Sequence, residues 1–235
     1  MVVHTVFDLL AWTMAALIGR WIAGKGWLSG SGEKRTLRSD PNYFTVLALG
    51  ALAGAILFGS LNLDLAGLLV PGHSIAGALA GGIIAVEIYK WRRGLHGSTG
   101  IPFVAPLAIG IAVGRVGCFL AGLPDYTYGI PTSLPWGVDF GDGVRRHPVQ
   151  LYEAAAMLVF LLIYLREIRR RNALFLQNGF YVLVVWYGTQ RFMWEFLKPY
   201  PKLLGPLNLF HILCLAMIAY GFFMIARSRD LRPAV

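Results

Sequence analysis

Charged residues are scarce in this sequence of 235 residues. Only 14% of the positions are Asp, Glu, Lys or Arg, whereas about a quarter is usual in a soluble domain. Hydrophobic residues make up 57% of the chain, and the mean hydropathy is +0.60. These values argue against a soluble domain and indicate an integral membrane protein.

Cysteine is also scarce, and its two occurrences, Cys118 and Cys214, both lie in apolar runs. This pattern predicts neither a disulfide framework nor a metal cluster. The sequence contains no nucleotide-binding loop and no persuasive metal-ligand cluster, so we expect no metal and no cofactor. The net charge of +9 does not indicate a nucleic-acid partner, because the basic residues fall in short groups between apolar runs, as in multi-span membrane proteins.

Apolar runs long enough to cross a bilayer, roughly 20 residues each, recur along the chain. They predict an all-α integral membrane protein, a seven-span helical bundle that forms a single transmembrane domain over residues 1–235. Small residues favour close helix packing, and the string GALAG occurs twice, at 50–54 and 77–81. The expected spans are 5–23, 43–61, 74–91, 101–123, 149–165, 179–197 and 207–226.

The distribution of Lys and Arg predicts the orientation of the bundle. Basic residues gather in the connections at 24–42, 90–93 and 166–171 and near the C-terminus, at Lys34, Arg35, Arg38 and Arg232 among others. The loop at 62–73 contains none. We therefore expect the N-terminus outside and the C-terminus in the cytoplasm. Residues 124–148 are too polar to cross the bilayer and are expected to form a short ordered cap on the outer side.

Two arginines, Arg115 and Arg191, lie inside apolar spans, where an unpaired charge costs at least about 2.5–3.5 kcal/mol. Counted from the cytoplasmic end at 1.5 Å per residue, they lie about 21 and about 18 Å deep, a similar height on two helices. Two guanidinium groups there would suit a phosphate headgroup from the outer leaflet. The alternative is that each side chain reaches outward to the interface, or that Arg191 pairs with Glu195 four residues later.

Other polar residues accompany these arginines. Tyr187 lies one turn before Arg191 on the same face, where it would either bind a phosphate or simply pack. Pro148 suits the first turn of a helix, which places Gln150, Tyr152 and Glu153 at the start of the fifth span. His147 precedes that helix and could act as a base, since its ordinary pKa is near neutrality, or could belong to a polar network at the helix start.

Three blocks of the sequence resemble the prolipoprotein diacylglyceryl transferase family. "GRVGCFLAG", with the later Gly129, is similar to the family's G-R-x-G-N-F-x-N-G block. "LPWGVDF" followed by "RRHPVQLYEA" is similar to its segment ending R-H-P-S-Q-L-Y-E. "WYGTQRFMWEFLKP" is similar to its Y-G-x-x-R-x-x-x-E-F block. The order of the blocks also agrees.

The resemblance implies transfer of a diacylglyceryl group from phosphatidylglycerol to the cysteine thiol in the lipobox of a preprolipoprotein signal peptide. It implies a multi-pass protein of the bacterial inner membrane, with membrane lipids, phosphatidylglycerol and the signal peptide as partners. The residues expected to take part in catalysis are Arg115, Arg191, Tyr187, His73 and His147. Those expected to bind substrate are Arg115, Gly117, Cys118, Gly129, Arg146, Gln150, Tyr152, Glu153 and Glu195.

The chain departs from the family pattern in several places. The second span lacks the family's G-G-R-x-G string, and the tyrosine of the family's first span is not evident. Two further departures affect single positions. The histidine of the family's H-G-G-L-I-G string is Ala76 here, and His73 would lie one turn away if the helix extended that far. The asparagine that follows the family's R-x-G is Cys118. These departures leave open a second hypothesis, a phospholipid-binding or phospholipid-handling membrane protein that lacks or has changed the transferase chemistry.

Overall fold

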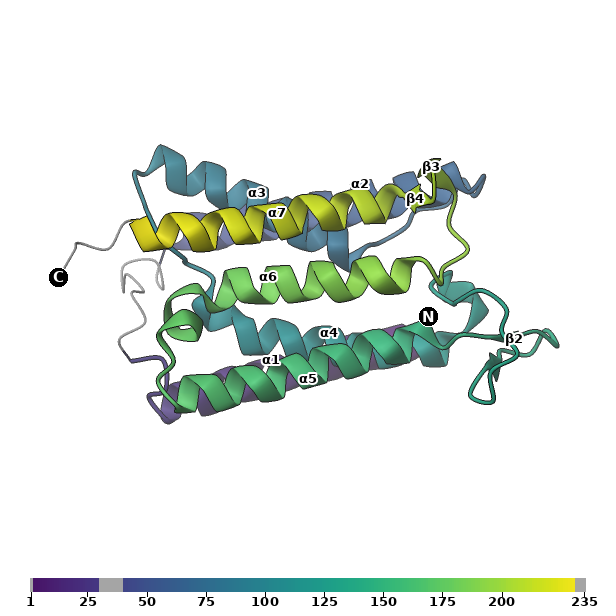
Figure 1. Cartoon of the computed structure of the whole chain (residues 1–235), viewed down its shortest axis with the longest axis horizontal. Helices are drawn as coiled ribbons and strands as arrows, with labels where there is room; N and C mark the ends of the chain where they lie inside the picture. The colour runs from purple at the N-terminus through teal and green to yellow at the C-terminus, as the bar shows by residue number, and fades with distance from the viewer. Residues whose placement is uncertain (1, 30–39, 231–235) are drawn as a thin grey trace. The chain divides into compact units, whose positions relative to one another are not determined.

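The computed structural model describes residues 2–29 and 40–230, and seven long α-helices dominate them (Figure 1). Each expected span corresponds to one helix, so the predicted all-α architecture is confirmed. The helices are α1 (Val2–Gly24), α2 (Pro41–Leu65), α3 (Ile75–Arg92), α4 (Val104–Ala121), α5 (Val149–Arg169), α6 (Ala173–Glu195) and α7 (Leu209–Asp230).

Four helical segments of the described residues are long and apolar enough to cross a membrane. They are Val3–Gly24, Pro41–Leu65, Ile101–Ala121 and Leu209–Ser228, the third of which includes a 3-10 turn, η2 (Ile101–Phe103). The remaining helices, α3, α5 and α6, contain more polar side chains, such as Glu153 in α5 and Arg191 in α6. These features are those of a multi-pass membrane protein. The basic residues Lys34, Arg35, Arg38 and Arg232, used above to predict orientation, lie outside the described residues.

The described chain forms two compact units, and the first comprises residues 2–29 and 100–199. In this unit α4 packs against both α1 and α5, and α5 packs against α6. Gly117 of α4 lies directly against α1, because a Cβ atom on it would come within 2.5 Å of the Cβ of Phe7. The close contact of α1 and α4 therefore depends on the absence of a side chain at position 117.

The segment between α4 and α5 in this unit contains short regular elements. After a 3-10 turn, η3 (Leu123–Asp125), a short antiparallel hairpin pairs β1 (Val138–Asp139) with β2 (Arg145–Arg146). The backbone N–H of Ile130 donates to the carbonyl of Leu197 at 2.7 Å, and the Ile130 carbonyl accepts from the N–H of His147 at 3.1 Å. This segment thereby connects the start of α5 to the turn that follows α6.

The second unit comprises residues 40–99 and 200–230, with α2, α3, α7 and the short strands β3 (Lys202–Leu204) and β4 (Leu207–Asn208). The glycines of the two GALAG strings face each other across α2 and α3. A Cβ atom on Gly54 would lie 2.2 Å from the carbonyl oxygen of Gly77, and one on Gly81 would lie 2.2 Å from that of Gly50. The repeated string is thus a seam along which two helix backbones touch.

The start of α3 is fixed by a side-chain cap. Ser74 is the N-cap, and its Oγ accepts a hydrogen bond from the N–H of Gly77 at 3.1 Å. The helix therefore does not extend to His73, which was the condition for His73 to lie one turn from Ala76. His73 is exposed, whereas Ala76 is buried.

A buried ion-pair cluster as candidate active site

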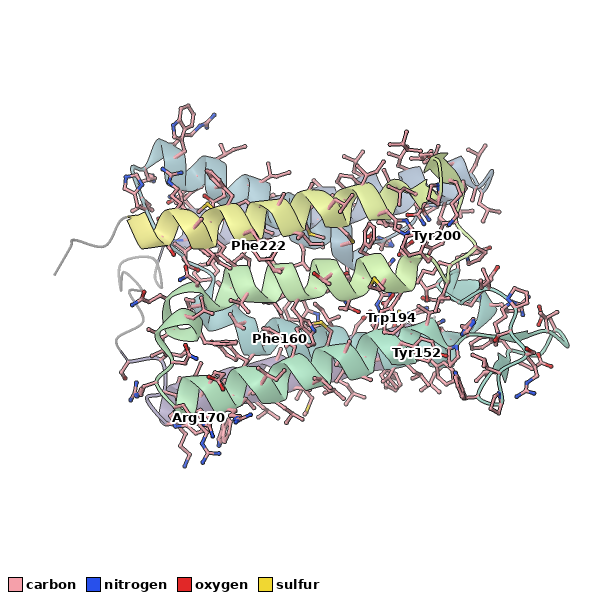
Figure 2. The ribbon with its side chains drawn as sticks, viewed as in Figure 1. Tyr152, Phe160, Arg170, Trp194, Tyr200 and Phe222 are labelled. Atoms are coloured by element: carbon pink, nitrogen blue, oxygen red, sulfur yellow. The ribbon has the colours of Figure 1, made fainter. Side chains whose placement is uncertain are left out.

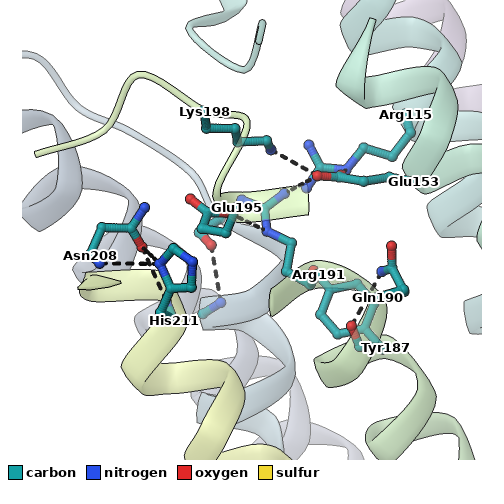
Figure 3. Close-up of polar contacts among 11 residues, drawn as sticks. Arg115, Glu153, Tyr187, Gln190, Arg191, Glu195, Lys198, Asn208 and His211 are labelled. Atoms are coloured by element: carbon teal, nitrogen blue, oxygen red, sulfur yellow. Dashed lines mark hydrogen bonds and ion pairs between the residues drawn. The ribbon is translucent and has the colours of Figure 1, made fainter. Parts of the chain in front are cut away.

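Five charged side chains of the first unit converge at the ends of α5 and α6, and we call them the ion-pair cluster (Figure 3). The cluster consists of Arg115 in α4, Glu153 in α5, Arg191 and Glu195 in α6, and Lys198 in the turn after α6. All five are buried, with Arg115 only 4% exposed and Arg191 only 2% exposed. Such buried charges are retained in a protein only where they are paired.

Glu153 is the centre of the cluster. Its Oε2 forms an ion pair with the Nε of Arg115. Its Oε1 lies 2.5 Å from the Nη1 of Arg191 and 2.8 Å from the Nζ of Lys198. One carboxylate therefore joins three cations that come from two helices and a turn.

Arg191 also pairs with Glu195, which lies four residues later in α6. The Nε of Arg191 is 2.9 Å from the Oε2 of Glu195. The two ion pairs of Arg191 coexist. Neither arginine reaches outward, because both are buried. The similar depth predicted for Arg115 and Arg191 agrees with their shared contact to Glu153.

The five side chains together carry three positive and two negative formal charges. This leaves one positive charge in excess within the cluster. Buried cations attract an anion beside them more strongly than they would in water. The two guanidinium groups are the natural partners for a phosphate, because their planar N–H donors match its oxygens.

Two further polar residues lie on the faces that carry the cluster. Tyr187 is buried one turn before Arg191, and its backbone carbonyl accepts a hydrogen bond from the Nε2 of Gln190 at 3.2 Å (Figure 3). Gln150 is fully buried one turn before Glu153 in α5. Neither Nε2 nor Oε1 of Gln150 has a hydrogen-bond partner among the described residues.

His147 and Tyr152 lie together at the start of α5. The Nδ1 of His147 is 3.4 Å from the Tyr152 hydroxyl, which also accepts a 2.8 Å hydrogen bond from the Nε1 of Trp136. The Tyr152 ring lies 5.3 Å from that of Trp194 (Figure 2). Within the described residues, His147 makes no hydrogen bond or ion pair with the cluster. This arrangement fits the alternative of a polar network at the helix start.

Arg146 belongs to the hairpin. Both of its terminal nitrogens lie 2.7 Å from the carboxylate oxygens of Asp142, and its guanidinium lies over the Tyr128 ring. The hydrogen bonds from Arg146 hold the pKa of Asp142 below its usual range. The structure thus places Arg146, which is half-exposed, in a pair of its own within the hairpin.

The three remaining candidates, Gly117, Gly129 and Cys118, lie on α4 or in the segment that follows it. Gly117 packs against Phe7, as described above. Gly129 packs against the residues that immediately precede α5, since a Cβ atom on it would lie 2.5 Å from the carbonyl oxygen of His147. Cys118 follows Arg115 by three residues on α4 and is half-buried. Their roles in substrate binding stay predictions.

We did not predict Lys198 from the sequence. It lies just past the expected sixth span, where a lysine normally extends to the interface. The signal that could have revealed it is the spacing of Arg191, Glu195 and Lys198, four and then three residues, which places charged groups on one helical face.

The apolar helices and the buried, cation-rich cluster define a multi-pass membrane protein with a site suited to an anion. The family model described as prolipoprotein diacylglyceryl transferase matches residues 4–227. The chain therefore belongs to the prolipoprotein diacylglyceryl transferase family, as its three sequence blocks predicted.

Individual relatives agree with this assignment. The chain is 32% identical to the phosphatidylglycerol–prolipoprotein diacylglyceryl transferase of Solidesulfovibrio magneticus, with 97% of each chain covered. It is 30% identical to the protein of the same name from Cupriavidus metallidurans, over 96% of this chain and 94% of the relative. No solved structure matches the chain significantly.

Proposed function

We propose that this protein transfers the diacylglyceryl group of phosphatidylglycerol to the cysteine thiol of preprolipoproteins, a step of lipoprotein biosynthesis. The observation that carries the proposal is the convergence of Arg115 and Arg191 on one buried carboxylate, Glu153. Two guanidinium groups held together away from water form a binding site for a phosphate.

The reaction needs no nucleophile from the enzyme. The thiol sulfur of the acceptor attacks the glyceryl carbon that carries the phosphate, and a C–S bond forms as the C–O bond breaks. The electron pair of that bond leaves with the phosphate oxygen, so the products are a thioether-linked diacylglyceryl protein and glycerol phosphate. The thiol proton passes to a base. The enzyme must therefore stabilise the leaving phosphate and exclude water.

Arg115 and Arg191 would bind the phosphate oxygens and stabilise the charge that develops on the leaving group. Donors fixed beforehand in a buried site are worth more than donors in water, because they need no rearrangement during the reaction. Glu153 holds both guanidinium groups in place and would share them with the phosphate when lipid binds. Glu195 orients Arg191, and Tyr187 would supply a further hydrogen bond.

The thiol proton has two candidate acceptors, His147 and His73. His147 is supported by its place at the start of α5, beside Tyr152 and within four residues of Gln150. His73 is exposed and would be available to water. The proposed substrate-binding set also includes Gly117, Cys118, Gly129, Arg146, Gln150 and Tyr152.

We further propose that the chain spans the bacterial inner membrane seven times as one transmembrane domain, with the N-terminus outside. In this orientation residues 124–148 form the outer cap, and the lipobox cysteine of the signal peptide reaches the cluster from that side. Basic side chains at the opposite end of α5, including Arg166 and Arg169, support the orientation.

The test is a transfer assay with purified protein, labelled phosphatidylglycerol and a lipobox peptide. Arg115→Ala and Arg191→Ala should each lower thioether formation at least about 100-fold, the scale of losing one charge-stabilising donor. Arg170→Ala is the matched control, because this exposed arginine lies at the other end of α5 (Figure 2). Lipid binding without product, under conditions in which a relative turns over, would favour the lipid-handling alternative.

A further inference from the structure

Gln150 is an unusual residue for a protein interior. Its side chain is fully buried, and neither its amide nitrogen nor its amide oxygen has a hydrogen-bond partner among the described residues. Burying an amide without compensating hydrogen bonds is costly, and native structures rarely do so without a functional reason. Two N–H donors and one carbonyl acceptor are thus available at this position.

The position of Gln150 relates it to the ion-pair cluster. It precedes Glu153 by three residues in α5, so the two side chains share one face and lie one turn apart, about 4.5 Å along the axis. Glu153 contacts both arginines, and Gln150 lies on the side of it nearer the helix start. A phosphate held by Arg115 and Arg191 would therefore have this amide beside it, toward the cap.

We propose that Gln150 binds the hydroxyl groups of the glycerol headgroup and thereby selects phosphatidylglycerol among phospholipids. The inference rests on the proposed function, since it assigns a lipid phosphate to the two arginines. The diol lies beyond the phosphate in this lipid, on the side away from the acyl chains. Gln150 would meet it there.

The chemistry of the amide suits a diol. Each hydroxyl both donates and accepts a hydrogen bond, so two of them satisfy the carbonyl oxygen and an N–H of Gln150 together. An ammonium headgroup has donors but no acceptor, and a quaternary ammonium has neither. A cationic headgroup would also add positive charge beside a cluster that already has one in excess. A neutral headgroup with hydroxyl groups is the one that satisfies both conditions.

The test compares two lipids with the same acyl chains and the same single negative charge, phosphatidylglycerol and phosphatidylmethanol. Phosphatidylmethanol keeps the phosphodiester but lacks the hydroxyl groups. The measured quantity is the ratio of kcat/KM for the two lipids with a lipobox peptide as acceptor. We expect the wild type to prefer phosphatidylglycerol roughly 10-fold to 100-fold, because a site built for a hydroxyl leaves its own polar atoms unpaired when the hydroxyl is missing.

Gln150→Met removes the amide and keeps the length of the side chain. This variant should lose most of the preference by becoming slower with phosphatidylglycerol, while its rate with phosphatidylmethanol stays the same or rises. Asn178→Leu is the matched control, since Asn178 is another buried amide, about three and a half turns before Arg191 in α6. Its loss should leave the lipid ratio unchanged. A purely structural role for Gln150 would lower both rates equally.

An equal fall with both lipids, an unchanged ratio, or a wild type that does not discriminate would each overturn the inference while leaving the proposed function in place. A wild type that forms no thioether with either lipid would instead contradict the proposed function itself. If Gln150→Met does not fold, Gln150→Asn tests the same point. It keeps an amide but withdraws it by one methylene group, and the same fall in the lipid ratio is expected.

Discussion

The Nη1 of Arg191 lies 2.5 Å from the Oε1 of Glu153, and both side chains are buried. The two residues are 38 positions apart and belong to different helices. Arg115, from a third helix, binds the other oxygen of the same carboxylate. Glu153 therefore fixes the separation of two arginines that would otherwise repel each other.

Glu153→Gln should destabilise the protein because it removes the one negative charge that three buried cations share. Breaking a buried pair on one side typically costs about 3–5 kcal/mol. The measurement is thermal or denaturant-induced unfolding of the purified protein in detergent. Asp142→Asn is the control, since this exposed carboxylate pairs with Arg146 in the hairpin and its removal should change stability little. Equal effects of the two substitutions would contradict the central role of Glu153.

The affinity for phosphatidylglycerol should fall as the pH rises through about 8. Burial in the turn after α6 lowers the pKa of Lys198 to about 8, well below the usual value for lysine. Below that pH the ammonium group is charged, and above it the cluster loses its excess positive charge. Lys198→Arg keeps the charge at all these pH values, because arginine stays protonated. The KM for phosphatidylglycerol between pH 7 and pH 9.5 should therefore rise more in the wild type than in Lys198→Arg, and parallel profiles would refute this.

Cys118→Asn places an amide where the resemblance to the family implies one. Cys118 lies three residues after Arg115 on α4 and is half-buried, so an asparagine there would face the same surroundings as the guanidinium. We expect the transfer rate to be preserved or raised. Cys118→Ala should not produce the same gain, because it lacks the amide. Abolition of the activity by both substitutions would instead indicate chemistry that depends on the thiol.

Gly54→Ala should destabilise the second unit. The added Cβ would lie 2.2 Å from the backbone carbonyl oxygen of Gly77, which cannot move without separating α2 from α3. Overpacking of this kind costs about 1–3 kcal/mol. Gly24→Ala is a suitable control, since a Cβ at Gly24 meets nothing within 4 Å. The unfolding midpoints of the two variants in detergent provide the comparison.

The helices were predictable because each is an apolar run, and the structure places one helix at every expected span. Their ends were less predictable. The fifth expected span stops at residue 165, whereas α5 continues to Arg169, because the polar last turn remains helical after the apolar run ends. The hairpin also escaped prediction, although the Gly141-Asp142-Gly143 string between its strands is a turn signal.

Most members of the candidate site were predictable from the sequence, with Lys198 as the exception, but the contacts among them were not. Arg115 and Arg191 are conspicuous, because charge is rare in apolar spans. Their common partner Glu153 could be suspected only as a residue near the start of a helix. Which carboxylate pairs with which arginine depends on how α4, α5 and α6 pack, and a one-dimensional pattern does not contain that information.

The charge of the ion-pair cluster bears on how the proposed reaction ends. A phosphatidylglycerol phosphodiester carries one negative charge, so the cluster and its bound substrate together are neutral. Cleavage converts the diester into a monoester, which carries about −1.5 to −2 at pH 7. The same five side chains then hold an excess of negative charge in a buried site. The attraction of Arg115 and Arg191 to the phosphate therefore grows as the bond breaks, which stabilises the leaving group, and release of glycerol phosphate has to overcome that stronger attraction.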